Sequence, residues 1–173
     1  MHDVFLGIGS NVGDRSNFLA DAVRKLRAAP TTRIVKVSSV YETEPVGVKE
    51  QSGFLNAAVW VQTSIGVHDF HSRIKLIEKK IGRLKRTHWG PREIDIDILL
   101  FGDLVLNEAG IVIPHTEMVN RKFVLEPLAE IAPETVHPAV HKTIKTLLAE
   151  CNDTSAVDRS AHLTNSLFTA LKE

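Results

Sequence analysis

The sequence contains a single cysteine, Cys151, so an internal disulfide framework is excluded and a reducing compartment is favoured. It also has no excess charge of either sign, because 21 Lys and Arg residues balance 21 Asp and Glu residues. A dedicated nucleic-acid-binding protein is usually clearly basic. No hydrophobic run approaches the length of a transmembrane helix, and the first residues, MHDVFLGIGS, lack the features of a signal peptide. These absences predict a cytoplasmic protein that binds neither membranes nor nucleic acid.

Hydrophobic residues, by contrast, are abundant and make up 43% of the 173 residues. A chain of this length and composition can bury one substantial core, and no linker or internal repeat divides it. We therefore predict a single domain spanning residues 1–173. Charge is concentrated locally, since the segment from Arg73 to Arg92 holds eight Lys or Arg residues and one acid, Glu78.

Hydrophobic periodicity predicts strands and helices in a recognisable order. Strands are expected over residues 4–8, 32–43, 54–63 and 94–98, and helices over 15–28 and 67–81. This β-α-β-β-α-β order is typical of ferredoxin-like α+β folds, with an antiparallel four-stranded sheet and both helices packed on one face. Residues 104–173 should add a C-terminal extension, with short strands near Val105 and Ile111, a helix over 141–150 and another helix near the C-terminus.

The segment EIDID alternates isoleucines with Asp95 and Asp97, which predicts a half-buried strand with both carboxylates on one face. Residues two apart on a strand have Cα atoms roughly 7 Å apart. Their oxygens suit Mg²⁺, which takes one or two carboxylates and completes its shell with water and phosphate. The pair by itself is equally compatible with ordinary salt bridges on a solvated face.

The segment that precedes these aspartates favours a ligand. Its cations surround Trp89-Gly90-Pro91, and they are Arg83, Lys85, Arg86 and Arg92. Cations beside a magnesium site match the needs of a nucleoside polyphosphate, because guanidinium groups neutralise the charge that develops during phosphoryl transfer.

Two further segments are candidates for binding. In FLN, Phe54 and Asn56 share a strand face, and an aromatic ring beside a carboxamide can bind a flat heterocycle. The segment IPHTEMVNRKF reads as a polar loop, in which His115 and Arg121 could reach phosphates and Phe123 supplies an aromatic ring.

Taken together, these motifs resemble those of the 6-hydroxymethyl-7,8-dihydropterin pyrophosphokinases. The resemblance runs from LGIGSNVGD to LEPLAEIAPE, with WGPREIDID as its most specific part. It implies transfer of pyrophosphate from ATP to the hydroxymethyl group of the reduced pterin, with release of AMP, in folate biosynthesis. The implied partners are these two small molecules, the implied cofactor is Mg²⁺ as a pair of ions bound with ATP, and a monomer would suffice.

The same resemblance implies a role for each matching residue. Asp95 and Asp97 would bind the metal, and Arg83 and Arg92 would be the catalytic cations. The ATP site would comprise Glu78, Lys85, Trp89, Ile98, Val112, His115 and Arg121. The pterin site would comprise Thr43, Pro45, Val46, Phe54, Asn56 and Phe123. The loops 43–53 and 83–92 would close over the bound substrates.

The sequence departs from the usual family pattern at Glu44, Lys85, His88 and Thr116. These departures concern secondary contacts, since lysine, for example, lacks the bidentate fork of arginine. Two alternatives to the pyrophosphokinase remain open from the residues alone. One is a two-metal nuclease or nucleotidyltransferase, which also uses paired aspartates, and the other is a non-catalytic RNA-binding module on a ferredoxin-like sheet.

Overall fold

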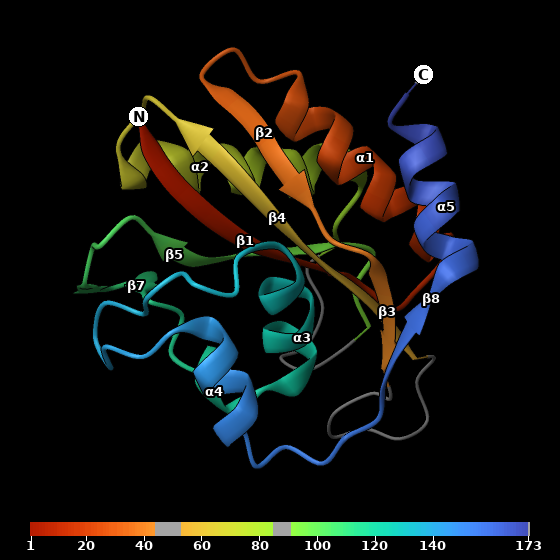
Figure 1. Cartoon of the computed structure of the whole chain (residues 1–173). Helices are drawn as coiled ribbons and strands as arrows, with labels where there is room; N and C mark the ends of the chain where they lie inside the picture. The colour runs from red at the N-terminus through yellow and green to blue at the C-terminus, as the bar shows by residue number, and fades with distance from the viewer. Residues whose placement is uncertain (44–52, 85–90, 173) are drawn as a thin grey trace.

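The computed structural model describes residues 1–43, 53–84 and 91–172. Its centre is an antiparallel sheet in the order β5-β1-β4-β3-β8, with β2 also paired to β4 (Figure 1). The strands are β1 His2–Ser10, β2 Thr32–Val37, β3 Val40–Thr43, β4 Phe54–Thr63, β5 Asp95–Phe101 and β8 Val157–Ser160. Along the chain, α1 follows β1 and α2 lies between β4 and β5. This order confirms the predicted ferredoxin-like core.

Helices α1 (Arg15–Arg27) and α2 (Val67–Ile81) cover one face of the sheet, as predicted. The Asp14 carboxylate caps α1 by accepting the backbone N–H of Asn17 at 3.1 Å. Gly82 ends α2 in the left-handed conformation, with φ of 107°. The main core lies beneath these helices, where side chains at alternate positions of β1, β4 and β5 are buried.

Helices α3 (Lys122–Ile131) and α4 (Ile144–Glu150) cover the opposite face of the sheet (Figure 1). They form a second core with Phe5, Ala58 and Leu99. The remaining elements are β6 Leu106–Glu108, β7 Ile111–Ile113, the 3₁₀ turn η1 Met118–Asn120 and α5 Ala161–Ala170. Helix α5 packs against α1, and β8 adds an edge strand beside β3.

Two features differ from the sequence-based expectation. Residues 32–43 form two strands rather than one, because the Ser38 hydroxyl accepts the Ala58 N–H at 2.8 Å and interrupts the backbone ladder. Helix α3 is not among the predicted helices, and Pro127 stands inside it, where proline normally disrupts a helix. Among the described helices, none is long and apolar enough to span a bilayer.

Candidate active site

A pocket opens on the face of the sheet that α3 covers only in part. Its floor is formed by β1, β4 and β5, and its walls come from β3, α2, α3 and the segment before β5. The pocket brings together the following predicted residues: Thr43, Phe54, Asn56, Arg83, Arg92, Asp95, Asp97, His115, Arg121 and Phe123. Residues from widely separated segments therefore line one cavity.

Two glycines of β1, Gly7 and Gly9, form part of the pocket floor, a role that the sequence analysis did not predict. A Cβ atom at Gly9 would lie 3.0 Å from Oδ1 of Asn56, whereas a Cβ atom at Gly7 would meet Leu99 at 3.5 Å. Glycine at position 9 therefore leaves the Asn56 amide room over the strand. Gly7 and Gly9 alternate with the buried Leu6 and Ile8, and this pattern was the available signal.

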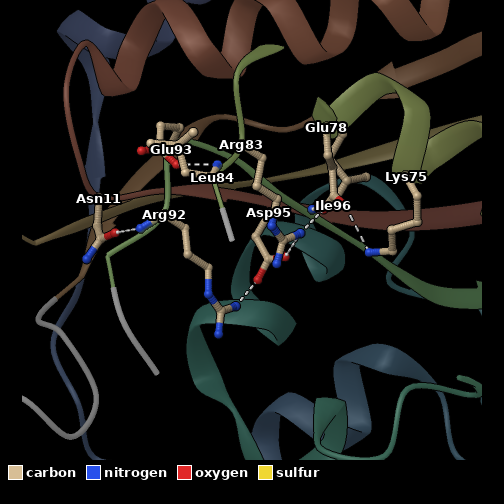
Figure 2. Close-up of polar contacts among 9 residues, drawn as sticks. All are labelled: Asn11, Lys75, Glu78, Arg83, Leu84, Arg92, Glu93, Asp95 and Ile96. Atoms are coloured by element: carbon tan, nitrogen blue, oxygen red, sulfur yellow. Dashed lines mark hydrogen bonds and ion pairs between the residues drawn. The ribbon is translucent and has the colours of Figure 1, made fainter. Parts of the chain in front are cut away.

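Asp95 and Asp97 lie at the start of β5 on the pocket side, while the adjacent isoleucines are buried under the helices. Arg83 binds the Asp95 carboxylate at 2.6 Å, and Arg92 pairs with its other oxygen (Figure 2). Burial, together with the nearby charge of Asp95, raises the pKa of Asp97, while His115 and Lys75 oppose the shift. The two carboxylates thus form a site that favours additional positive charge.

Glu78 is buried in the last turn of α2 and connects that helix to β5. One carboxylate oxygen accepts the Ile96 N–H at 2.8 Å and pairs with Arg83, and the other pairs with Lys75 at 3.0 Å (Figure 2). Burial raises the pKa of Glu78, although the neighbouring cations oppose this. Burial disfavours the charge of Arg83, but Asp95 and Glu78 outweigh it and raise the Arg83 pKa. Glu78 therefore holds Arg83 beside the aspartates.

The backbone of Arg92 is fixed by Asn11, a residue that the sequence analysis did not single out. The Arg92 N–H donates to the Asn11 side-chain oxygen at 2.7 Å, and the Asn11 N–H donates to the Arg92 carbonyl at 3.1 Å (Figure 2). Nearby, the Glu93 carboxylate accepts the Leu84 N–H at 3.2 Å. These contacts join the end of β1 to the residues on either side of segment 85–90.

Polar and aromatic groups form the other end of the pocket. The Asn56 side-chain amide donates to the Thr43 hydroxyl at 2.9 Å, which fixes the carboxamide between β3 and β4. Phe54 lies on the same side of β4 as Asn56, and Phe123 reaches the pocket from α3. The guanidinium of Arg121 lies 5.9 Å from the centre of the Phe123 ring. This end offers ring faces beside an amide edge.

His115 follows a cis Ile113–Pro114 bond. Its backbone N–H donates to the Leu99 carbonyl at 2.9 Å. Its Nδ1 accepts the Glu117 N–H at 3.3 Å. In a neutral imidazole the accepting nitrogen carries no proton, so this contact assigns the proton to Nε2. The His115 ring therefore presents a donor for an oxygen ligand.

The other predicted site residues lie away from the pocket lining or outside the described ranges. Glu78 is buried behind Arg83, Ile98 packs into the helix-side core, and Val112 is 41% exposed on β7. Segments 44–52 and 85–90 lie outside the described residues. They contain Pro45, Val46, Lys85 and Trp89, together with Glu44, His88 and most of both predicted closing loops. Thr116, the remaining departure from the family pattern, lies within the described residues and is exposed. The pocket offers the carboxylates of Asp95 and Asp97 as oxygen donors for a metal. No cluster of three or more His, Cys, Asp or Glu is found among the described residues.

Comparison with known proteins identifies relatives of the chain. Residues 5–133 match the family described as 7,8-dihydro-6-hydroxymethylpterin-pyrophosphokinase (HPPK). The chain is 42% identical over 145 residues to 2-amino-4-hydroxy-6-hydroxymethyldihydropteridine pyrophosphokinase of Aquifex aeolicus, covering 84% of this chain and 89% of that protein. It is 41% identical over 159 residues to the protein of the same name from Methylorubrum extorquens, covering 92% and 99%.

Solved structures of similar fold include wild-type HPPK-DHPS of Plasmodium falciparum, with a TM-score of 0.69 and 17% identity. The match covers 86% of this chain and 44% of that protein, so the chain spans less than half the length of that relative. At this identity the similarity concerns the fold. The sequence relationships are closer and extend over most of the chain. The chain therefore belongs to the 7,8-dihydro-6-hydroxymethylpterin-pyrophosphokinase family.

Proposed function

We propose that the pocket between β5 and α3 is the active site for the reaction of this family. The chain is an ATP-dependent pyrophosphokinase of folate biosynthesis, which transfers pyrophosphate from ATP to the hydroxymethyl group of 6-hydroxymethyl-7,8-dihydropterin. One observation carries the assignment to this pocket. A cluster of carboxylates and guanidinium groups shares its cavity with an aromatic and carboxamide cluster, as two different substrates require.

The ATP triphosphate would lie over Arg83, Arg92, His115 and Arg121. These groups converge on the cavity from four separate parts of the chain. Arg83 and Arg92 pair with Asp95 in the structure, so they already lie beside the predicted metal site. Guanidinium groups held in fixed positions stabilise the charge that develops on phosphate oxygens without reorganisation during the reaction. We assign the catalytic role to Arg83 and Arg92 on this ground.

Asp95 and Asp97 would hold Mg²⁺, which we expect as two ions bound together with ATP. The fit rests on the donor chemistry, because two carboxylates with added water and phosphate oxygens complete a magnesium shell. Burial beside Asp95 raises the pKa of Asp97, so a cation there would relieve an unfavourable concentration of negative charge. When bound, the ions neutralise phosphate oxygens and polarise the phosphorus under attack.

The pterin would occupy the other end of the pocket, between Phe54 and Phe123. Ring stacking would orient the heterocycle, and the Asn56 carboxamide would bind its hydrogen-bonding edge. Thr43 holds that carboxamide at 2.9 Å, which fixes its orientation before the substrate arrives. In this arrangement the hydroxymethyl group would point towards the cationic end. Catalysis would then depend mainly on position and electrostatics.

We further infer that residues 1–173 form one pyrophosphokinase domain. The described segments that follow the family match add β8 to the edge of the same sheet and pack α5 against α1. Family membership also decides against the two alternatives that the sequence left open, the two-metal nuclease and the RNA-binding module.

The direct test is to incubate the protein with ATP, Mg²⁺ and 6-hydroxymethyl-7,8-dihydropterin and to separate the nucleotides. AMP should form in proportion to the pterin diphosphate. The Asp95→Ala and Asp97→Ala proteins, which lack a metal ligand, should form almost none. Formation of ADP in place of AMP would refute pyrophosphate transfer, and near-normal turnover by the aspartate variants would refute the metal assignment.

A further inference from the structure

The carboxylate of Glu130 lies on the last turn of α3 and binds the junction between β2 and β3. It accepts the Ser39 N–H at 3.0 Å, the Ser39 hydroxyl at 2.8 Å and the Tyr41 hydroxyl at 2.9 Å. Ser39 is 1% exposed, so its N–H has little access to water and requires a protein acceptor. Glu130 supplies that acceptor from an element about 90 residues away in the sequence.

The two elements that Glu130 connects carry opposite walls of the proposed pterin site. Helix α3 begins directly after Arg121 and contains Phe123. Strand β3 ends at Thr43, whose hydroxyl accepts the Asn56 amide. Tyr41 is also the β3 residue paired with Asn56 in the β3–β4 register. A displacement of α3 from β3 would therefore change the distance between the aromatic wall and the carboxamide.

The C-terminal segment reinforces the same junction. The Arg159 side chain donates to the Ser39 hydroxyl at 2.7 Å, and the Thr164 hydroxyl accepts the Val40 N–H at 2.9 Å. Strand β8 pairs with β3 along Val40–Thr43. These contacts come from residues beyond the family match, which ends at residue 133. The junction is thus held from α3 on one side and from the C-terminal segment on the other.

We propose that Glu130 is a positioning residue that sets the separation of the two walls of the acceptor site, and so controls affinity for the pterin rather than for ATP. The proposal rests on the proposed function. The chemistry of the contact supports it, because a phenol is protonated at neutral pH and the Tyr41 hydroxyl donates to the Glu130 carboxylate at 2.9 Å. At the ATP end, Arg83 and Arg92 are held separately from this junction, by Glu78 and Asp95.

The test compares Glu130→Ala, Glu130→Gln and Tyr41→Phe in steady-state assays with each substrate varied in turn. Loss of the three hydrogen bonds in Glu130→Ala should raise KM for the pterin about tenfold, which corresponds to about 1.4 kcal/mol. KM for ATP should change much less, by under about twofold, since Arg83 and Arg92 are held by Glu78 and Asp95 rather than by α3. Tyr41→Phe, which removes one bond, should give a smaller rise of the same kind.

Glu130→Gln serves as the rescue variant. Its amide oxygen can accept from the Ser39 N–H and the Tyr41 hydroxyl, while its NH₂ group donates to the Ser39 hydroxyl. Most of the pterin affinity should therefore return. Glu134→Gln is the matched control, because the Glu134 side chain is 70% exposed and its carboxylate pairs with the exposed Lys145 at 2.7 Å. Its kinetic constants should match those of the wild type.

The outcomes separate this proposal from the proposed function. If the wild type forms AMP but Glu130→Ala and Tyr41→Phe lose thermal stability with both KM values unchanged, Glu130 merely supports the fold and the proposal is wrong. An equal rise in KM for both substrates would also refute it. If the wild type forms no AMP, the proposed function fails, whatever the variants do. Should Glu130→Ala not fold, the Tyr41→Phe and Glu130→Gln proteins still decide between these results.

Discussion

The Glu78 carboxylate accepts the backbone N–H of Ile96 at 2.8 Å, and Ile96 is the residue between Asp95 and Asp97. A single buried side chain on α2 therefore fixes the strand backbone that presents both predicted metal ligands. The same oxygen pairs with Arg83, which in turn binds Asp95 at 2.6 Å. Helix, strand and catalytic cation are thus connected through one carboxylate.

Replacement of Glu78 should therefore damage the site even though Glu78 does not line the pocket. Glu78→Ala would leave the buried Ile96 N–H without its acceptor, which should destabilise the protein by about 1–3 kcal/mol. Glu78→Gln can still accept that N–H but loses its charge beside Arg83 and Lys75. We expect it to remain folded with kcat lowered at least about tenfold. Chemical denaturation and steady-state kinetics measure the two effects, and unchanged kcat in Glu78→Gln would contradict this account.

Asp97→Asn should increase stability while removing activity. The Asp97 carboxylate is partly buried beside Asp95, and its desolvation and the charge of Asp95 both disfavour its ionised form and raise its pKa. The amide keeps the shape without the charge, so the substrate-free protein should gain about 0.5–2 kcal/mol, or a few degrees in Tm. Addition of Mg²⁺ and ATP should raise the Tm of the wild type more than that of the variant. A lower Tm for substrate-free Asp97→Asn would show that the carboxylate is not under electrostatic strain.

Gly9→Ala tests the importance of the pocket floor. The added Cβ would lie 3.0 Å from Oδ1 of Asn56, so the carboxamide must move. Because a polar binding group would be displaced, kcat/KM for the pterin should fall by at least about tenfold. Gly7→Ala is the matched substitution on the same strand, where the Cβ atom would make an ordinary 3.5 Å contact with Leu99. Its effect should be clearly smaller, and equal losses in both variants would argue against a specific role for Asn56.

The raised pKa of Tyr41 predicts that the wild type loses more stability at alkaline pH than Tyr41→Phe does. Burial and Glu130 raise its pKa, so the folded protein holds the phenolic proton more tightly than the unfolded chain. Below the ordinary tyrosine pKa of about 10 both states are protonated, and the contribution to stability is fully present. As the pH rises above that value the unfolded chain ionises first, and stability is lost. Urea denaturation should show a steeper loss of stability above about pH 10 for the wild type than for Tyr41→Phe, and parallel losses would contradict the prediction.

Several elements of the site could be predicted because their signals are local. The alternation of Ile94, Ile96 and Ile98 with two aspartates determines which side chains face the pocket, since successive strand residues point to opposite faces. The same rule places the Ile98 side chain in the core. Any contact between Ile98 and a ligand in the pocket would therefore involve its backbone. The predicted ATP role of Ile98 remains a prediction.

Helix α3 shows where local signals conflict. Pro127 indicates a break, but Leu125, Leu128 and Ile131 recur at helical spacing and are buried in the second core. Burial of this apolar stripe against Phe5 and Ala58 outweighs the hydrogen bond that proline cannot make. The spacing of the leucines was the signal that could have identified the helix.

The order of the core elements, the shared strand face of Asp95 and Asp97, and that of Phe54 and Asn56 can be predicted from the sequence. Each of these follows from periodicity within one segment. The positions of Glu78 behind Arg83, of Asn11 against Arg92, and of Glu130 between α3 and the β2–β3 junction are visible only in the folded protein. These contacts join residues distant in sequence, and they depend on how the helices pack against the sheet rather than on any local pattern.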